Sequence, residues 1–390
     1  MAQMPSYPVD RGNIVEYLET QLDSFEERPF CDVDSLVLSW FSYCAFPKAC
    51  HGWRGAPLAE LYDKGQLGTM TAVMGDPAAY RHMLAALVAS PRFRGMRVCA
   101  YADETDEATE KQFSAVTFRF PGPVTYVAFR GTDGTLVGWR EDFNMALETE
   151  LPSQRSAADY LRRVVFHTRG PLYVGGHSKG GNLAVYALMS CPGRAVPRIV
   201  AAYSHDGPGF PASFIESPVW KEREHLVRKT IPHQSVIGML FELQDDYRVV
   251  KATSDGIMQH DPFSWEVEGS DFVYADRLSF GARHLDASIK GWVTGVDHDG
   301  RALFVDTLFD VFAASGKTTF REIGESWQAT VPAMLERMGR IPQEQREAFG
   351  RIVWALVREL VTDQHLKGTA QPKISDLLAG TQLGDWLAQV

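Results

Sequence analysis

The most informative part of the chain is residues 172–184, which read Leu-Tyr-Val-Gly-Gly-His-Ser-Lys-Gly-Gly-Asn-Leu-Ala. The first apolar residues of this stretch predict a short strand, and residues 182–189 have the apolar spacing of a helix. Between them, Gly176 and Gly180 flank Ser178 in the pattern Gly-x-Ser-x-Gly. A serine in a sharp strand-to-helix turn needs small residues two positions away, because larger side chains would collide with the strand and the helix. The pattern predicts a nucleophile elbow at Ser178; the alternative is a glycine-rich turn with an incidental serine.

Strand-like and helix-like runs alternate around this elbow. From about residue 96, β-branched and aromatic residues form runs at 98–101, 115–120 and 124–129, and Pro121-Gly122-Pro123 joins the last two as a turn. Helical spacing at 157–166 and 182–189 then alternates with strand-like runs at 172–175, 199–203, 236–241 and 247–251. Such alternation predicts a mostly parallel central sheet with crossover helices.

Helical patterns dominate both ends of the chain. We expect residues 1–95 to form a helical segment packed on an α/β core at 96–295, and residues 296–390 to form a C-terminal helical region. Apolar residues from Phe349 to Leu360 make the clearest C-terminal stripe, and the segment from Gly295 to Gly300 is the best candidate boundary. The three parts are expected to form one compact unit.

Charge and composition restrict the partners. The 390 residues include 39 Lys and Arg against 49 Asp and Glu, a formal net charge of -10, so nucleic acid is not an expected partner. The 5 cysteines contain no Cys-x-x-Cys pair, which argues against a disulfide framework or a zinc knuckle. No secretory signal is recognisable at the N-terminus, and the apolar stretch at 36–41 is too short to span a bilayer. We expect a cytoplasmic protein without an integral membrane segment.

Sequence motifs for cofactors and metals are also missing. Residues Ser315-Gly316-Lys317-Thr318-Thr319 imitate the end of a phosphate-binding loop, but Val311 stands where that loop should open with glycine. We expect Gly316 to end a helix instead. No His-Glu-x-x-His or calcium-loop pattern occurs, so neither a metal nor a cofactor is expected.

A serine nucleophile requires a base, since its hydroxyl is unreactive until the proton is removed. The histidines after Ser178 are His205, His225, His233, His260, His284, His298 and His365. We choose His260 as the base because it lies in a loop just after the strand-like run at 247–251, where a last strand would deliver it. For His233, beside Pro232, a capping or packing role is the expected one.

The acid that orients the base is expected to be Asp206. Asp206-Gly207-Pro208-Gly209 directly follows the predicted strand at 199–203, which suits a buried carboxylate close to the sheet edge. Asp-Gly is also a common turn signal, so a structural Asp206 remains the alternative. The other candidate acids are Asp245, Asp246 and Asp255.

The oxyanion formed on attack needs two preorganised donors. One is expected to be the backbone N–H of Lys179, the residue after the nucleophile, and the other to come from Thr132 in the loop after the run at 124–129. We expect Arg130 to make a structural ion pair there, with Asp142 as one candidate partner. The aromatic residues Trp40, Phe41, Tyr43 and Phe46 could wall an acyl pocket, but core packing is the expected role.

Two groups of motifs together resemble a known family. Phe129-Arg130-Gly131-Thr132, followed by Trp139 and Asp142, and Gly176-His177-Ser178-Lys179-Gly180-Gly181 look like the paired signatures of class 3 lipases, a branch of the α/β-hydrolases. The wider wording, including Asp34-Ser35-Leu36, Gln112-Phe113-Ser114-Ala115, Asp206-Gly207-Pro208-Gly209-Phe210 and Gln259-His260-Asp261-Pro262, resembles a bacterial family of lipase-like hydrolases of undetermined function. The resemblance implies an α/β-hydrolase fold with helical N- and C-terminal additions. It also implies Ser178 as nucleophile, His260 as base, and Thr132 with Lys179 around the oxyanion.

The chain departs from class 3 lipases at two positions. Those enzymes usually have leucine where Lys179 stands, and they place their acid after the next strand, near Pro232-His233-Gln234-Ser235, where this chain has no carboxylate. Either Asp206 is the acid, delivered from the preceding strand, or the triad is incomplete.

The reaction that these residues predict is hydrolysis of a carboxylic ester of a small acyl substrate, through an acyl-enzyme on Ser178. Two alternatives remain. The same residues could act on thioesters or peptides, and the elbow could belong to a non-catalytic protein that binds an acyl ligand or a partner.

Overall fold

The computed structural model describes residues 11–63, 65–71, 76–106, 111–122, 124–132, 150–240, 242–280, 282–283, 307, 309–317, 333 and 336–337. The chain divides into two compact units, one of residues 1–133 with 141–290 and the other of residues 134–140 with 291–390. Nearly all described elements belong to the first, here called the sheet unit.

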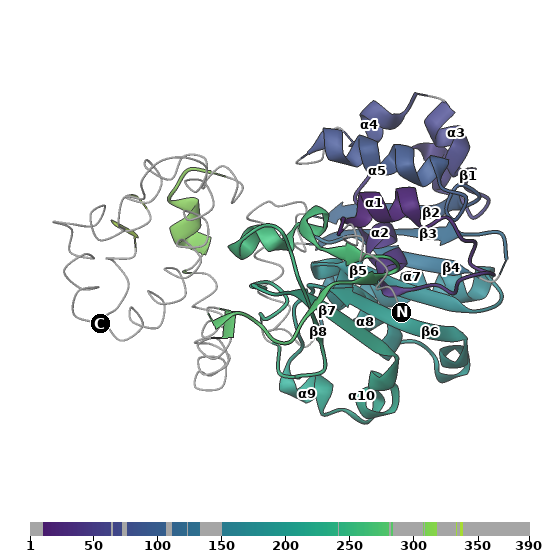
Figure 1. The fold of residues 1–390 in the computed structure, drawn as a ribbon. Helices are drawn as coiled ribbons and strands as arrows, with labels where there is room; N and C mark the ends of the chain where they lie inside the picture. The colour runs from purple at the N-terminus through teal and green to yellow at the C-terminus, as the bar shows by residue number, and fades with distance from the viewer. Residues whose placement is uncertain are drawn as a thin grey trace, which may run out of the picture. The chain divides into compact units, whose positions relative to one another are not determined.

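The elements of the sheet unit follow one another as labelled in Figure 1. The α-helices are α1 (Ile14–Thr20), α2 (Asp32–Phe41), α3 (Leu58–Asp63), α4 (Leu67–Thr71), α5 (Pro77–Ala89), α7 (Pro152–His167), α8 (Lys179–Met189), α9 (Ala212–Ile215) and α10 (Pro218–Arg223). The strands are β1 (Ala56–Pro57), β2 (Arg97–Asp106), β3 (Lys111–Arg119), β4 (Thr125–Phe129), β5 (Leu172–His177), β6 (Ile199–His205), β7 (Val227–Pro232), β8 (Arg248–Val250), β9 (Val267–Glu268), β10 (Asp271–Phe272) and β11 (Tyr274–Ala275). Short 3-10 turns include η5 (Gly256–His260) and η6 (Pro262–Ser264).

One mixed sheet organises the unit. Among the described residues it has nine strands in the order β1-β2-β3-β4-β5-β6-β7-β8-β11. Strands β4 to β8 run parallel, and the pairs at both edges are antiparallel. The carboxyl ends of β5, β6 and β7 therefore meet at one edge of the sheet, where loop residues from distant parts of the chain come together. The expected α/β fold with a parallel central region is confirmed.

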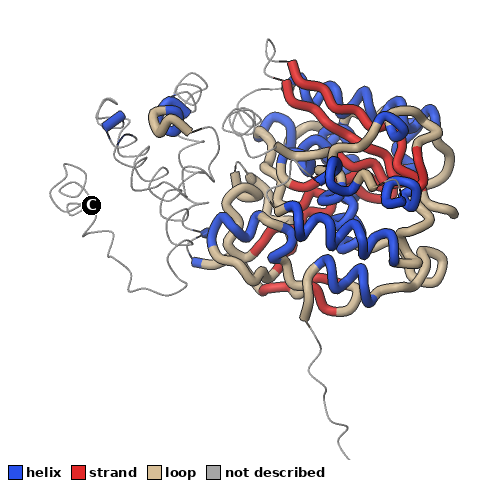
Figure 2. Tube along the Cα trace, turned by 90° about the horizontal axis from the view of Figure 1, so that it is seen from above, coloured by secondary structure: helices blue, strands red, loops and turns tan. Residues whose placement is uncertain are grey.

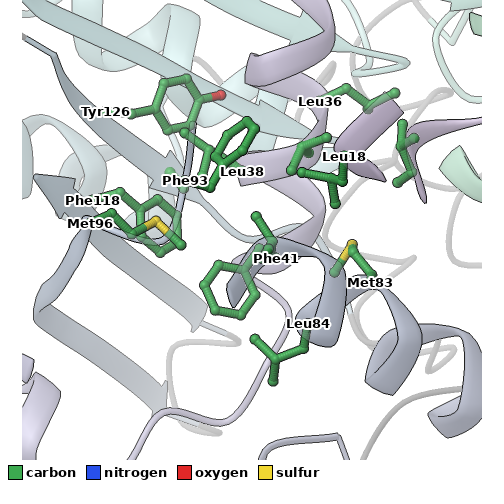
Figure 3. Packing of buried hydrophobic residues seen from close by; sticks show 14 of the residues in the cluster. Leu18, Leu36, Leu38, Phe41, Met83, Leu84, Phe93, Met96, Phe118 and Tyr126 are labelled. Atoms are coloured by element: carbon green, nitrogen blue, oxygen red, sulfur yellow. The ribbon is translucent and has the colours of Figure 1, made fainter. Parts of the chain in front are cut away.

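Helices cover both faces of the sheet, as Figures 1 and 2 show. Alternate strand residues supply the two cores, because successive side chains point to opposite faces. Tyr126 and Ala128 of β4 pack with α1, α2 and α5, whereas Val127 and Phe129 pack with α7 and α8. Figure 3 shows part of the first core, in which Phe41 of α2 and Leu84 of α5 lie among the buried side chains.

The N-terminal helices begin where local sequence signals place them. Asn13 caps α1 by accepting from Val15 N at 2.7 Å, and Glu16 completes a capping box by accepting from Asn13 N. Asp76 caps α5 with its side chain, which accepts from the backbone N–H groups of Ala78 and Ala79, and proline follows at the first helical position. Of these helices, α2 is the most deeply buried, since nine of its ten residues are buried. These caps and apolar faces explain why the predicted N-terminal helices form.

One predicted strand is wrong. Residues 236–241 were expected to be extended, but the described residues 236–240 form turns, and the strand of this region is β7 at Val227–Pro232. Ile237, Met239 and Leu240 are buried in these turns, so the apolar run reflects burial and not extended backbone. Strand β7 escaped prediction because the charged residues Arg228 and Lys229 interrupt its partly exposed first half and only its last three residues are buried.

The second unit is described only in short pieces. Gly316 has a φ of 69° at the end of a helical segment, as expected of a helix-ending glycine. The predicted boundary at 295–300 and the apolar stripe at 349–360 lie outside the described residues. Within the part of the chain that is described, no helix is long and apolar enough to cross a membrane.

Candidate active site

Ser178 occupies a strained turn between β5 and α8. Its backbone has φ 57° and ψ -134°, a combination that residues other than glycine rarely adopt. Its N–H donates to the carbonyl of His205 at 2.9 Å, which ties the turn to the end of the neighbouring strand β6. The serine is only 4% exposed. The predicted strand-turn-helix context of Ser178 is confirmed.

The flanking glycines are required by close backbone approach. A Cβ on Gly180 would lie 2.0 Å from the carbonyl oxygen of Phe129, and a Cβ on Gly176 would lie 2.2 Å from the carbonyl carbon of Gly180. Both neighbours are main-chain atoms that cannot rotate away. Glycine at these two positions therefore lets β4, β5 and α8 meet around the turn.

Asp206 and His260 form a hydrogen-bonded pair. The Nδ1 of His260 donates to Oδ2 of Asp206 at 2.6 Å, although the two residues are 54 positions apart in the chain. Asp206 follows β6 with a positive φ of 51° and is 1% exposed, while the His260 side chain is 19% exposed. The structure thus brings together the two residues that the sequence suggested as acid and base.

Further donors hold the Asp206 carboxylate. Its other oxygen, Oδ1, accepts from Ser235 Oγ at 2.5 Å and from Gly238 N at 3.0 Å. Lys229 in turn donates to the Gly238 carbonyl at 2.8 Å and forms a buried ion pair with Glu242. The hydrogen bonds from His260, Ser235 and Gly238 together hold the Asp206 carboxylate in one orientation.

Ser235 lies in the segment where a carboxylate was sought in the sequence and none was found, and its hydroxyl donates to the Asp206 carboxylate. Of the other acid candidates, Asp255 accepts from Gln234 Nε2 at 3.3 Å, and Asp245 and Asp246 lie in the loop before β8. Asp206 is the candidate that the structure pairs with His260.

The loop after β4 lies against the nucleophile turn. A Cβ on Gly131 would be 3.0 Å from the Cβ of Ser178 and 2.2 Å from the hydroxyl of Tyr43. Thr132 follows directly in this loop, and Lys179 is the first residue of α8, at the helix end where N–H groups point outward. Lys179 therefore adjoins Ser178 in the chain, and the loop that carries Thr132 lies against Ser178 at Gly131.

The charged side chains near this loop have structural partners. Lys179 is fully buried, and its Nζ donates to the carbonyl of Gln112 at 3.1 Å. Arg130 forms its ion pair with Asp103 of β2 at 2.9 Å. The structural role predicted for Arg130 is confirmed, with Asp103 as partner; Asp142, the partner considered from the sequence, lies outside the described residues.

Two buried histidines at strand ends had no role assigned from the sequence. His205 ends β6, with its ring nitrogens hydrogen-bonded to Ser35 Oγ at 2.9 Å and Thr230 Oγ1 at 2.7 Å. Burial lowers the pKa of His205 to about 3. Burial also lowers the pKa of His177, at the end of β5, well below its usual value, so both are neutral near pH 7. The only sequence signal for these two histidines was that each closely follows a short apolar run that predicts a strand.

The aromatic cluster predicted near the N-terminus divides into two parts. Phe41 and Phe46 pack in the core, their rings 5.1 Å apart, as expected. Trp40 and Tyr43 also contact His177. Their ring centroids lie 5.0 Å and 5.9 Å, respectively, from that of His177. No group of three or more His, Cys, Asp or Glu residues that could hold a metal is found in the described ranges.

The solved structures to which the chain is similar include three lipases. A fungal lipase in an inhibitor complex has 13% sequence identity and a TM-score of 0.32, with 59% of this chain and 94% of that chain covered. A Rhizomucor miehei lipase propeptide complex has 12% identity and a TM-score of 0.32 over 58% of this chain and 88% of that one. Lip2 lipase from Yarrowia lipolytica has 12% identity and a TM-score of 0.34 over 68% and 88%.

No curated protein matches the sequence. A family model described as Mbeg1-like matches residues 87–310, a span that contains the β2 to β11 sheet, Ser178, Asp206 and His260. That span is more than half of the chain, and the chain belongs to the Mbeg1-like family.

Proposed function

We propose that this protein is a serine hydrolase of the esterase or lipase type that cleaves a carboxylic ester through an acyl-enzyme on Ser178. The observation that carries the proposal is the 2.6 Å hydrogen bond between His260 and Asp206, at the sheet edge where Ser178 sits in its strained turn. A serine in such a turn becomes a nucleophile when a base with a fixed ring orientation can take its proton.

In the first half-reaction, Ser178 Oγ attacks the ester carbonyl carbon and its proton passes to His260. Because Nδ1 of His260 is bonded to Asp206, Nε2 is the nitrogen that takes this proton. Asp206 stabilises the imidazolium that forms and keeps the ring oriented. The alcohol leaves with the proton from His260 when the tetrahedral intermediate collapses to the acyl-enzyme.

In the second half-reaction, water attacks the acyl carbonyl and gives its proton to His260. The acid product then leaves as Ser178 Oγ recovers the proton. In both steps the negative oxygen is stabilised by the backbone N–H groups of Lys179 and Thr132, with the α8 N-terminus adding its partial positive charge. The hydroxyl of Thr132 is a further donor to the same oxygen.

The test is turnover of p-nitrophenyl esters from acetate to palmitate, with matching acyl thioesters and p-nitroanilides to compare leaving groups. Wild type is expected to prefer an ester, and Ser178→Ala to lose at least about a thousand-fold in kcat. Ser190→Ala, at the other end of α8, is the matched control and should keep wild-type turnover. Full turnover by a folded Ser178→Ala variant would reject the proposal.

A further inference from the structure

The backbone carbonyl of the base is held by a buried histidine next to the nucleophile. The Nε2 of His177 lies 2.8 Å from the carbonyl oxygen of His260, and the His177 side chain is 1% exposed. A carbonyl oxygen only accepts, so Nε2 of His177 carries the proton of this hydrogen bond. His177 precedes Ser178 directly, and this contact therefore connects the nucleophile turn to the segment that bears the base.

A tyrosine lies beside the other ring nitrogen of His177. The Tyr43 hydroxyl lies 3.1 Å from Nδ1 of His177 and 3.3 Å from the His177 carbonyl oxygen. Because Nε2 carries the proton toward the His260 carbonyl, Nδ1 is an acceptor, and the Tyr43 hydroxyl can donate to it or to the His177 carbonyl. Burial lowers the pKa of His177, so the ring stays neutral and keeps this single tautomer. The donor toward His260 is thus set in advance by its surroundings.

Ring packing restricts His177 further. Its ring centroid lies 4.3 Å from that of His260, and Trp40 meets it edge-on at 5.0 Å. The segment that bears the base is a short 3-10 turn that is also held by hydrogen bonds to Gln259 and Gly256: Trp265 Nε1 donates to the Gln259 carbonyl at 2.8 Å, the Gln259 side chain accepts from Gln234 N at 2.7 Å, and Gly256 N donates to the Gln234 side chain at 2.7 Å. His177 adds a hydrogen bond to the main chain of His260.

We propose that His177 is a positioning residue for the base, and that its Nε2–H, with Tyr43 beside the other ring nitrogen, holds the His260 carbonyl so that the His260 ring stays aligned with Ser178. The catalytic consequence rests on the proposed hydrolase function. His177 neither touches the substrate nor transfers a proton. It acts on the geometry, where a displacement of about 1 Å costs on the order of a hundred-fold in rate.

Three variants separate positioning from simple packing. His177→Leu removes both side-chain hydrogen bonds of His177, Tyr43→Phe removes only the hydroxyl beside Nδ1 and the His177 carbonyl, and His177→Gln can place an amide N–H where Nε2 lies. We expect kcat to fall roughly 30- to 100-fold in His177→Leu and roughly 3- to 10-fold in Tyr43→Phe, with KM changed less than about three-fold in each. His177→Gln should recover most of the loss. Equal losses in the Gln and Leu variants, or changes confined to thermal stability, would overturn the proposal.

A second measurement does not need turnover. The proton between His260 Nδ1 and Asp206 is expected to give a downfield proton NMR signal, identified by its loss in Asp206→Asn. In folded His177→Leu this proton should exchange with water at least about ten-fold faster than in wild type, with Tyr43→Phe intermediate and His177→Gln close to wild type.

The two readouts distinguish the two proposals. If wild type hydrolyses no ester but the exchange rates follow this order, the hydrolase function fails and the positioning role stands. Hydrolysis by wild type together with unchanged kcat and unchanged exchange in folded His177→Leu would overturn the positioning role alone. If His177→Leu does not fold, kcat and the exchange rate are compared between wild type, Tyr43→Phe and His177→Gln.

Discussion

The Ser178 turn and the Asp206–His260 pair lie at the same sheet edge but are built differently. The turn is made by consecutive residues and is held by main-chain contacts, with Gly176 and Gly180 packed directly on backbone atoms. The pair joins residues 54 positions apart and is held by side-chain hydrogen bonds from loops. Disturbing the turn should therefore damage the fold, whereas disturbing the pair should remove activity and leave the fold intact.

The largest effect is expected from Asp206→Asn. The amide is nearly the same size and tolerates the positive φ, but it cannot stabilise the imidazolium or enforce the same tautomer of His260. We expect kcat for ester hydrolysis to fall on the order of a thousand- to ten-thousand-fold, while the thermal midpoint changes little. Asp255→Asn and Asp245→Asn are controls that should keep wild-type kcat. A larger loss in either control would move the acid role away from Asp206.

Gly180→Ala is expected to lower the stability of the fold. The added Cβ would lie 2.0 Å from the Phe129 carbonyl oxygen, so β4 and α8 must separate. We expect the free energy of unfolding in urea to fall by at least about 3 kcal/mol. Gly193→Ala is the matched control, since its Cβ meets nothing within 4 Å, and it should stay within about 0.5 kcal/mol of wild type. Equal stability of the two variants would show that close approach does not hold the turn.

A smaller effect on activity is expected from Thr132→Val, which removes the hydroxyl but keeps the backbone N–H. Loss of one oxyanion donor should lower kcat about a hundred-fold without raising KM in proportion. Thr125→Val, at the opposite end of β4, is the control. Unchanged kcat in Thr132→Val would restrict the contribution of this residue to its backbone.

The smallest effect concerns His205, which links the two regions because its carbonyl accepts from Ser178 N. Burial lowers its folded-state pKa to about 3, below the unfolded value, so the unfolded state binds a proton first as the pH falls. Its contribution to stability is therefore complete above about pH 6.5 and is lost progressively toward pH 3, at about 1.4 kcal/mol per pH unit. Between pH 6 and pH 4, the free energy of unfolding in urea should fall less steeply with decreasing pH in His205→Gln than in wild type, by about that amount per pH unit. The same pH dependence in wild type and His205→Gln would mean that His205 is not held as a neutral ring in the folded protein.

The same contrast explains what could be predicted from the sequence. The Ser178 turn is local, so its pattern and the strand and helix beside it could be read directly. The region around Asp206 depends on contacts that no local pattern encodes. Its supporting turns at 236–240 resembled a strand because they are buried, and the donor Ser235 stood where a carboxylate was sought.

Ion-pair and hydrogen-bond partners on different strands and helices could not be predicted from the sequence either. Arg130 pairs with Asp103 of β2, which is near only after the sheet has formed. His177 and His205 were visible as residues that follow apolar runs, but their hydrogen bonds reach helix α2 and the loop after it. Alternation of elements predicted the parallel arrangement of the central sheet but not strand β7, and the antiparallel edge strand β11 is too short to leave a pattern.

The most direct test of an activated serine is intact-mass detection of labelling by a fluorophosphonate probe. Wild type should take up one probe molecule, and Ser178→Ala none. Folded His260→Ala and Asp206→Asn should label at least about a hundred-fold more slowly, because the serine then lacks an oriented base. Labelling of Ser178→Ala, or labelling of His260→Ala at the wild-type rate, would contradict the assignment of Ser178, His260 and Asp206 as nucleophile, base and acid.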